Sequence, residues 1–105
     1  MSMESAIKAE ERSDGGASSA MDGVALALPA LMRAQKLQKR AARTGFDWPD
    51  VIGAVEKIGE EIEELLEAED EAERIDEAGD LLFAAVNMVR HMGVNAEDAL
   101  RAANA

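Results

Sequence analysis

Cysteine is absent from this 105-residue sequence, and histidine occurs only once, as His91. Without cysteine there is neither a disulfide framework nor a thiolate metal site. The residue three positions before His91 is a methionine, so the Glu-x-x-His spacing of di-iron helical bundles is missing as well. No nucleophile is paired with this histidine by spacing, and we predict a structural or surface role for it.

Long apolar runs are also missing. No stretch reaches the roughly 18 residues that span a bilayer, and the first residues do not combine a basic segment with an apolar one. The net charge is −11, from 22 acidic and 11 basic residues. This excess argues against nonspecific binding to nucleic acid or to an anionic membrane. We therefore expect a soluble, cytoplasmic protein with no nucleic-acid or membrane partner.

The composition changes near residue 24. Residues 1–23 join a short charged stretch to a run rich in Ser, Gly and Asp, which is typical of a linker with too little apolar surface to offset the entropy of ordering. We predict a flexible, linker-like segment at residues 1–23 and one helical domain at residues 24–105. About 80 residues are marginal for an independent helical core, so we also expect partner chains.

Helical patterns divide the domain, with proline and glycine at the boundaries. The first helix is predicted at residues 29–44, because Pro29 suits a first turn and Gly45 suits a left-handed cap. A second is predicted at about residues 49–69 and a third at about residues 72–91. A short fourth segment follows Asn95, which can cap it. No β alternation of useful length is present, so the predicted fold class is all-α.

Five cations lie on the first predicted helix of this acidic chain. Four of them recur at a spacing that places them along one stripe, and the fifth lies beside it: Arg33, Lys36, Arg40 and Arg43, with Lys39 alongside. A solvated face is one interpretation. The other is that the stripe faces anions.

Aromatic residues are few, and two of the three stand in the turn before the second helix, at Phe46 and Trp48. We predict Asp47 or Trp48 near the cap of that helix and Pro49 in its first turn. The aromatic pair could staple the helix entry to the core. Alternatively, it could form a wall against which a nucleobase stacks.

The carboxylates of the second and third helices are the candidate functional residues. Glu61 and Glu64 stand three residues apart, as do Glu77 and Asp80, and such pairs face the same way on a helix. Two pairs brought together would make a hard-oxygen site for Mg²⁺ or Mn²⁺. Glu60 stands beside the first pair. A solvated acidic helix is the alternative for this pattern taken alone.

Position around the second helix separates its glutamates. Its apolar seam consists of Val51, Val55, Ile58, Ile62 and Leu65. At about 100° per residue, Glu61 falls roughly 60° and Glu64 roughly 120° from Ile58, on the flank that also carries Lys57. This flank borders the core, where a carboxylate needs a partner.

The third predicted helix is apolar nearly all round from residue 81 to residue 89, so we expect it to be buried between neighbours. Its seam consists of Ile75, Ala78, Leu82, Val86 and Val89. On the opposite side Glu77, Asp80 and Asn87 fall in line. An isolated Asp80 carboxylate would be expensive to bury, whereas a divalent cation shared with Glu61 and Glu64 removes that penalty.

These segments together resemble the MazG nucleoside triphosphate pyrophosphohydrolases. The similarity covers about residues 22–104, and residues 5–11 resemble the linker that joins the two halves of tandem MazG proteins, so the chain is similar to a second half alone. The matching segments are residues 28–48, then Glu60-Glu61-x-x-Glu64, then Glu77-x-Gly79-Asp80-Leu81-Leu82-Phe83-Ala84-x-Val86-Asn87. The resemblance implies a helical bundle of the all-α NTP pyrophosphatase type that is completed by homodimerisation. It also implies Mg²⁺-dependent hydrolysis of nucleoside triphosphates to nucleoside monophosphate and pyrophosphate.

The resemblance assigns roles to particular residues. The metal ligands would be Glu61, Glu64, Glu77 and Asp80. Glu60 or Glu64 would accept the proton of the water that attacks the α,β-phosphate linkage. The implied substrate-binding residues are Lys57, facing the phosphates, and Glu61, Arg74, Asp80, Asn87, Lys39, Arg43 and Trp48.

The sequence departs from the family in two places. Family members carry a basic residue just before the ExxD turn, and Arg74 stands near that place in a shifted register. They also continue past the position of Asn104 with a basic stretch that contacts the nucleotide, whereas this sequence ends at Ala105. We expect metal binding to persist and triphosphate affinity and turnover to be weakened. The alternative is a catalytically silent helical dimerisation module that keeps the fold, with or without the metal.

Overall fold

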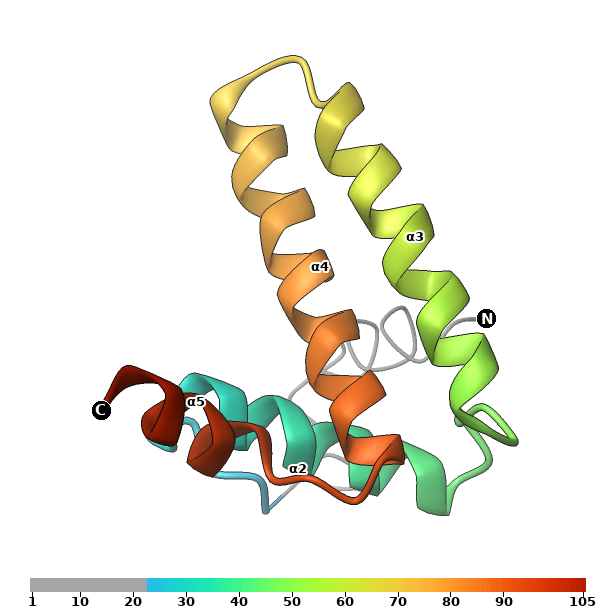
Figure 1. The fold of residues 1–105 in the computed structure, drawn as a ribbon, viewed down its shortest axis with the longest axis vertical. Coiled ribbons are helices and arrows are strands. Elements are labelled where there is room, and N and C mark those ends of the chain that lie inside the picture. Colours follow the sequence, from blue (N-terminus) through green and yellow to red (C-terminus); the bar gives the residue numbers. More distant parts are fainter. Residues whose placement is uncertain (1–22) are drawn as a thin grey trace. The chain divides into compact units, whose positions relative to one another are not determined.

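The computed structural model describes residues 23–105, and every regular element in this part of the chain is an α-helix (Figure 1). The helices are α2 (Ala30–Arg43), α3 (Val51–Glu67), α4 (Glu71–His91) and α5 (Ala96–Asn104). The all-α prediction is confirmed. The predicted linker-like segment at residues 1–23 lies outside the described residues, except for Gly23. Along residues 23–105, no helix combines the length and hydropathy of a membrane span.

The described residues form two compact units. One comprises residues 23–47 together with Ala96–Ala105, and the other is Trp48–Asn95. The first unit contains α2 and α5, and the second contains α3 and α4. All the carboxylates of the predicted metal site therefore belong to one unit, whose internal geometry can be described by itself.

In the first unit, α2 holds the start of α5 through a buried glutamine. Oε1 of Gln35 accepts a hydrogen bond from the backbone nitrogen of Ala96 at 2.9 Å, and both residues are buried. The first N–H groups of a helix have no partner inside the helix, so Gln35 supplies one from outside. Leu37 and Ala41 are buried on the same helix. The sequence pattern had not indicated this contact.

A glycine follows the end of α2 and another follows the end of α4. The sequence predicted the first of these, Gly45. Gly45 and Gly93 have φ of 93° and 77°, values that favour glycine because it has no Cβ. After α2, the backbone nitrogens of Gly45 and Phe46 donate to the carbonyls of Ala42 and Ala41 at 3.1 and 3.0 Å. This pairing is the Schellman motif, which satisfies carbonyls that the helix end leaves open.

The start of α3 differs from the prediction. Asp50 is its cap, and its Oδ1 accepts a hydrogen bond from the backbone nitrogen of Ile52 at 2.9 Å. The predicted caps, Asp47 and Trp48, were wrong, and Pro49 lies before the helix instead of in its first turn. The extended backbone of Asp50 and its short carboxylate are the features that a cap requires.

Helices α3 and α4 lie side by side and form an antiparallel hairpin (Figure 1). Ala68 is extended after α3, so this helix ends two residues earlier than predicted. Asp70 then caps α4, with Oδ1 accepting from the backbone nitrogen of Glu73 at 2.8 Å. A turn this short fixes the two helices in an antiparallel pair.

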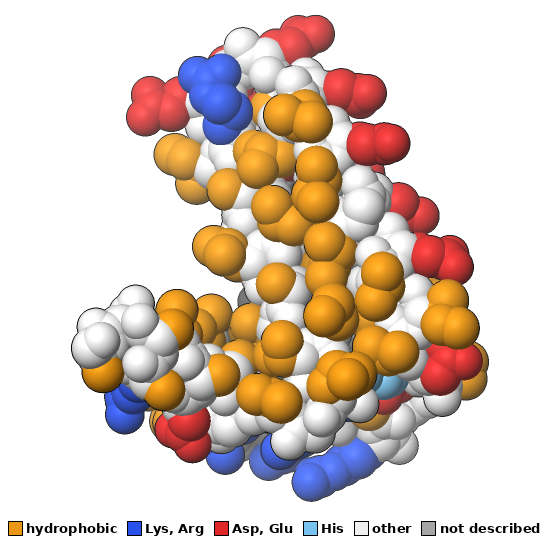
Figure 2. Space-filling model, in the orientation of Figure 1, with side chains coloured by type: hydrophobic (Ala, Val, Ile, Leu, Met, Phe, Trp, Pro, Cys, Tyr) orange, Lys and Arg blue, Asp and Glu red, His pale blue; other side chains and the backbone are white. Residues whose placement is uncertain are grey.

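Within this chain, the predicted burial of the α4 seam is confirmed for Val86 and wrong for Ile75 and Leu82. Ile75 and Leu82 are 65% and 60% exposed, whereas Ala84, Val86 and Asn87 are the buried residues of α4. A two-helix hairpin covers only one stripe of each helix, and the apolar perimeter of α4 is wider than α3 can cover. Helix α3 likewise leaves large apolar side chains exposed: Ile52, Val55, Ile62 and Leu66. Figure 2 shows hydrophobic side chains running along both helices.

The indole of Trp48 lies on the first turn of α3 because residue 53 is a glycine. A Cβ at Gly53 would stand 2.7 Å from Cδ2 of Trp48, while a Cβ at Gly59 would meet nothing within 4 Å. We therefore expect Gly59→Ala to raise the free energy of unfolding by about 0.5–1 kcal/mol through helix propensity. Gly53→Ala should lower it by about 1 kcal/mol, because the displaced ring outweighs the same gain. Urea denaturation of both variants tests this, and equal gains would contradict the packing described.

Candidate metal centre

The hairpin brings carboxylates from both helices together. Glu61 of α3 and Glu77 and Asp80 of α4 each offer a ligand oxygen, and these three oxygens lie within 4.8 Å of one another. Glu61 is buried, and the other two residues are half-buried. The sequence left open whether the carboxylate pairs meet within one chain or between two chains. The described chain brings these three together by itself.

Two oxygens of this cluster are buried without a hydrogen bond. Among the described residues, Oε2 of Glu61 and Oε2 of Glu77 have no hydrogen-bond partner. A buried carboxylate oxygen that lacks a donor costs free energy, and native structures rarely retain one without a reason. Carboxylate oxygens are also the ligands that Mg²⁺ and Mn²⁺ prefer. The donor set and its two open oxygens fit a divalent cation.

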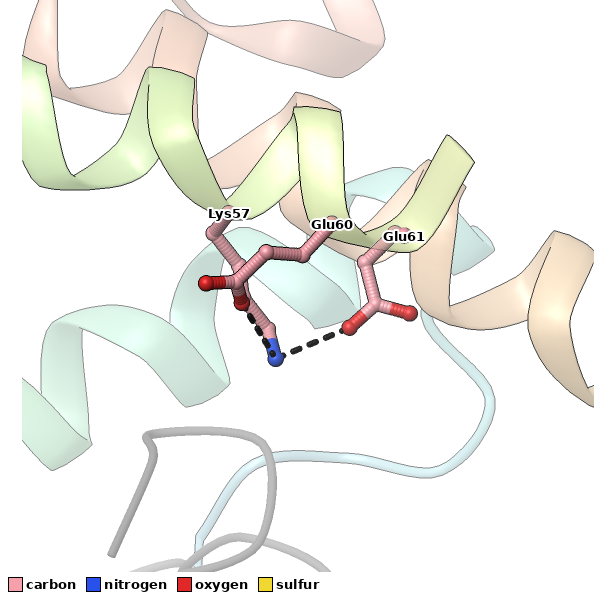
Figure 3. A network of polar contacts seen from close by, with 3 residues as sticks. All are labelled: Lys57, Glu60 and Glu61. Carbon is pink, nitrogen blue, oxygen red and sulfur yellow. Dashed lines mark ion pairs between the residues drawn. The ribbon is translucent and has the colours of Figure 1, made fainter. Parts of the chain in front are cut away.

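Lys57, which lies on α3 as Glu61 does, neutralises part of the negative charge of the cluster (Figure 3). Its Nζ lies 2.9 Å from Oε1 of Glu61 and 3.7 Å from Oε2 of Glu60. The Glu61 side chain is 2% exposed, whereas that of Glu60 is 66% exposed. Lys57 therefore pairs closely with one oxygen of the buried glutamate and leaves its second oxygen open.

The environment of the cluster shifts the pKa of Glu77. Burial raises its pKa above the ordinary value, a hydrogen bond with Glu64 raises it further, and so do the negative charges of Glu64, Asp80 and Glu61. Two carboxyl groups can share a hydrogen bond only when one of them holds a proton. A proton at Glu77 thus relieves the repulsion that a cation would otherwise relieve.

Mg²⁺ and a proton should compete for Glu77. Because its folded-state pKa is raised, protonated Glu77 stabilises the metal-free fold fully below the unfolded value of 4.5, and this contribution is lost as the pH rises through the folded-state pKa. Cation binding requires the ionised carboxylate. We expect the increase in Tm on adding Mg²⁺ to shrink as the pH falls from about 8 to about 5. Thermal scans with and without Mg²⁺ measure this, with Glu77→Gln as the control; an increase that grows at low pH would contradict it.

Other predicted site residues of this unit lie outside the three-residue cluster. Glu64 is exposed on α3 and reaches it only through Glu77. Glu60 is exposed and contacts Lys57. Arg74 is exposed in the first turn of α4, and Asn87 is buried two turns beyond Asp80 on the same helix. Their assigned roles remain predictions.

The other predicted substrate-binding residues, Lys39, Arg43 and Trp48, do not all belong to the same unit. Lys39 and Arg43 lie on α2 with exposed side chains, as does Lys36. The other two cations of the predicted stripe, Arg33 and Arg40, are half-buried, so the stripe is not one uniform solvated face. Trp48 lies in the second unit and is 36% exposed.

Sequence reasoning missed one residue that contacts a predicted site residue. Arg90 donates two hydrogen bonds to Asn87 from the same helix. The spacing of three residues between them was a usable signal, since such residues are neighbours on a helix. We had applied the three-residue spacing only to the carboxylates.

The profile of the phosphoribosyl-ATP pyrophosphohydrolase family matches residues 29–105. This match places the chain, with its α-helical hairpin and clustered carboxylates, in the class of all-α pyrophosphohydrolases. Within this class, the chain belongs to the MazG nucleoside triphosphate pyrophosphohydrolase family.

Two curated relatives support this assignment. The nucleoside triphosphate pyrophosphohydrolase of Escherichia coli K12 is 52% identical over 103 residues, which cover 93% of this chain and 39% of the relative. The nucleoside triphosphate pyrophosphohydrolase/pyrophosphatase MazG of Thermotoga maritima is 45% identical over 97 residues, which cover 92% of this chain and 38% of the relative. The chain thus spans about two fifths of the length of the relatives it matches.

Proposed function

We propose that this chain hydrolyses nucleoside triphosphates to nucleoside monophosphate and pyrophosphate with Mg²⁺, for which Mn²⁺ can substitute. The observation that carries the proposal is the cluster of Glu61, Glu77 and Asp80 with its two open buried oxygens. The names of the two relatives, both nucleoside triphosphate pyrophosphohydrolases, supply the substrate class. The cluster supplies the cation site that phosphoryl chemistry needs.

Glu61, Glu77 and Asp80 would hold the cation, with Glu64 as a fourth ligand. The positions of the first three favour this, and the hydrogen bond between Glu77 and Glu64 puts the fourth carboxylate within reach. A bound Mg²⁺ would neutralise the phosphate oxygens and fix their orientation for attack by water. Cation binding would require Glu77 in its ionised form.

The side chains around the cluster perform the remaining tasks. Lys57 stands beside Glu61 with its ammonium at the edge of the cluster, where it can face the phosphates. Glu64 or Glu60 accepts a proton from the attacking water. The new P–O bond forms at the α,β-phosphate linkage as the bridging bond breaks, and pyrophosphate leaves with the electron pair of that bond. Because phosphoryl transfer depends mainly on positioning and charge, no protein nucleophile is required.

In the unit that holds the cluster, we assign a phosphate contact to Arg74 and a substrate contact to Asn87. Lys39 and Arg43 belong to the other unit and keep the substrate-binding role that the family resemblance implies. Trp48 is the candidate for stacking on the nucleobase, since its ring rests on the backbone at Gly53 and stays 36% exposed. An aromatic ring held in this way can stack without first losing conformational freedom.

We further propose that the active form is a homodimer, with a second copy on the exposed apolar face of the hairpin. We define this face by six residues: Ile52, Val55, Ile62, Leu66, Ile75 and Leu82. Among residues 23–105, the buried apolar residues are seven, of which four are alanine: Ala41, Ala54, Ala84 and Ala96, with Val24, Leu37 and Val86. So small a core favours stabilisation by a partner. The apolar face is larger than single exposed side chains would explain.

The exposed face also keeps the second candidate function open, a catalytically silent dimerisation module. Pyrophosphate release from the common nucleoside triphosphates, measured with and without Mg²⁺, separates the two. Mg²⁺-dependent release supports the pyrophosphohydrolase. Mg²⁺ binding and dimerisation without turnover at micromolar protein would instead favour the silent module.

A further inference from the structure

The two units of the chain carry opposite excesses of charge. Residues 23–47 and 96–105 hold six basic and three acidic residues, whereas residues 48–95 hold three basic and fourteen acidic ones. Five of the cations lie on α2, which has no acidic residue. Opposite charges attract over about one Debye length, roughly 8 Å at physiological ionic strength. A second copy of the chain therefore offers an acidic surface to α2 of the first.

The exposed cations of α2 form one row. Its members are Lys36, Lys39 and Arg43, and we call them the α2 cation row. A spacing of three and then four residues places them on one side of the helix, whereas Gln38 and Ala41 are fully buried on another side. Among residues 23–105, no member of the row forms an ion pair. The row is therefore available to an anion from outside the described chain.

Helix α3 carries the complementary row. Its members are four exposed glutamates, which we call the α3 carboxylate row: Glu56, Glu60, Glu63 and Glu67. At about 100° per residue, all four fall within about 40° of the side opposite Ile58. Figure 2 shows acidic side chains along the edge of α3 that faces away from α4. Nζ of Lys57 lies 3.7 Å from Oε2 of Glu60, and the other three glutamates form no ion pair within the described part of the chain.

The two rows match in spacing. Glu60, Glu63 and Glu67 step by three and then four residues, as the α2 cation row does. Parallel helices with equal rise therefore bring each cation to one carboxylate. Antiparallel helices give the same match with Glu56, Glu60 and Glu63. A single exposed pair contributes little, but several pairs in register form a network. Because every copy carries both rows, a second copy can satisfy both, whereas a small anion would leave the carboxylate row without a counterpart.

We propose that the α2 cation row of one copy docks on the α3 carboxylate row of a second copy. The proposal goes beyond the proposed function, because the contact needs neither a nucleotide nor a divalent cation. It joins two different surfaces, so it adds copies beyond the proposed dimer, whose two copies share the apolar face. Lys39 and Arg43 also belong to the substrate-binding residues that the resemblance implies. A docked copy would therefore cover them and compete with a triphosphate.

Sedimentation equilibrium of the full chain, without nucleotide or Mg²⁺, tests the contact. We expect the weight-average mass to rise with protein concentration up to about 500 μM in about 50 mM NaCl, and the rise to disappear in about 500 mM NaCl, because salt screens exposed charge pairs. The proposed dimer depends on apolar burial, so this salt should not dissociate it. A rise that persists at high salt, or no rise at low salt, overturns the proposal.

Two charge-reversed chains test which surfaces meet. Lys36→Glu with Lys39→Glu reverses the α2 cation row, and Glu56→Lys, Glu63→Lys and Glu67→Lys together reverse the α3 carboxylate row. Each variant alone brings like charges together, so its association beyond the dimer should weaken by at least about 10-fold. An equal mixture pairs opposite charges again and should recover the parent association within about 3-fold. A mixture that associates no better than its components overturns the proposal.

A control matched in charge separates the row from net charge. Glu69→Lys, Glu71→Lys and Asp76→Lys add the same charge as the α3 variant at exposed positions outside the row. This control should associate at least as well as the parent, and circular dichroism checks the helix content of every variant. A loss of association equal to that of the α3 variant overturns the proposal.

Cross-linking of the parent chain gives a readout that needs no variant. A carbodiimide joins a lysine ammonium directly to a carboxylate that it contacts. In a mixture of isotope-labelled and unlabelled copies at low salt, we expect Lys36 or Lys39 to be joined to the α3 carboxylate row of a differently labelled copy. Cross-links confined to single copies, or to carboxylates outside the row, overturn the proposal.

Discussion

Replacement of Glu61 by glutamine should abolish most pyrophosphate release. The side chain keeps its shape but loses one of three clustered carboxylates, and we expect kcat/KM to fall by at least about 100-fold. The same variant should lose the increase in Tm that Mg²⁺ gives the parent, because binding to the folded state alone produces that increase. Pyrophosphate assays and thermal scans at several Mg²⁺ concentrations measure both effects.

The Tm of Glu61→Gln in the absence of Mg²⁺ provides a separate readout. Glu61 is almost completely buried, and its negative charge repels that of Glu77. Removing this charge should therefore keep or raise the Tm without Mg²⁺. Lys57 is 21% exposed and retains Glu60 as a charged partner. Glu63→Gln is the matched control, since Glu63 is exposed on the same helix. The metal-centre assignment fails if Glu61→Gln retains both its turnover and its response to Mg²⁺.

Placing lysine on the apolar face of the hairpin should convert the proposed dimer to a monomer. Ile62 and Leu82 are 43% and 60% exposed in the single chain, so Ile62→Lys with Leu82→Lys should leave the helices intact and destroy the interface. Burying two unpaired charges in each protomer should weaken association by at least about 100-fold. Sedimentation equilibrium measures the change, and circular dichroism confirms the helix content.

A charge-matched control separates the interface from net charge. Each lysine adds one positive charge, and Glu56→Gln with Glu63→Gln adds the same total on exposed positions of α3. We expect this control to remain dimeric. The proposed face is wrong if the control dissociates as readily as the lysine variant, or if the lysine variant stays dimeric.

The helix pattern and part of the site followed from the sequence because they depend on local rules. Gly45 predicted the end of α2, since its missing Cβ permits a positive φ. Helical angle predicted that Glu61 borders the core, and this is confirmed by its burial. Periodicity assigns each residue to a side of its helix, and in an antiparallel hairpin this was enough to bring carboxylates of two helices together.

The rest depended on which surfaces meet, and periodicity does not contain that information. The sequence predicts that Leu82 lies on an apolar side of α4. It does not indicate whether α3 or another chain covers this side chain, which is exposed in the single chain. The cap of α3 was missed because Asp47 and Asp50 are equally good caps by composition, and only the backbone shows which is extended. The contact between Gln35 and Ala96 is a single hydrogen bond between residues far apart in the sequence, which leaves no periodic signal.

The hairpin has a consequence for how the metal site comes into being. Glu61, Glu77 and Asp80 are close along the chain and are joined through one short turn between α3 and α4. Closing so short a loop costs little entropy and is fast compared with assembling distant segments. We therefore expect the carboxylates to come together early in folding, before the proposed dimer forms. A cation that binds at this stage would lower the unfolding rate of the hairpin, and its concentration would set how much of the newly made chain becomes available for the proposed dimer.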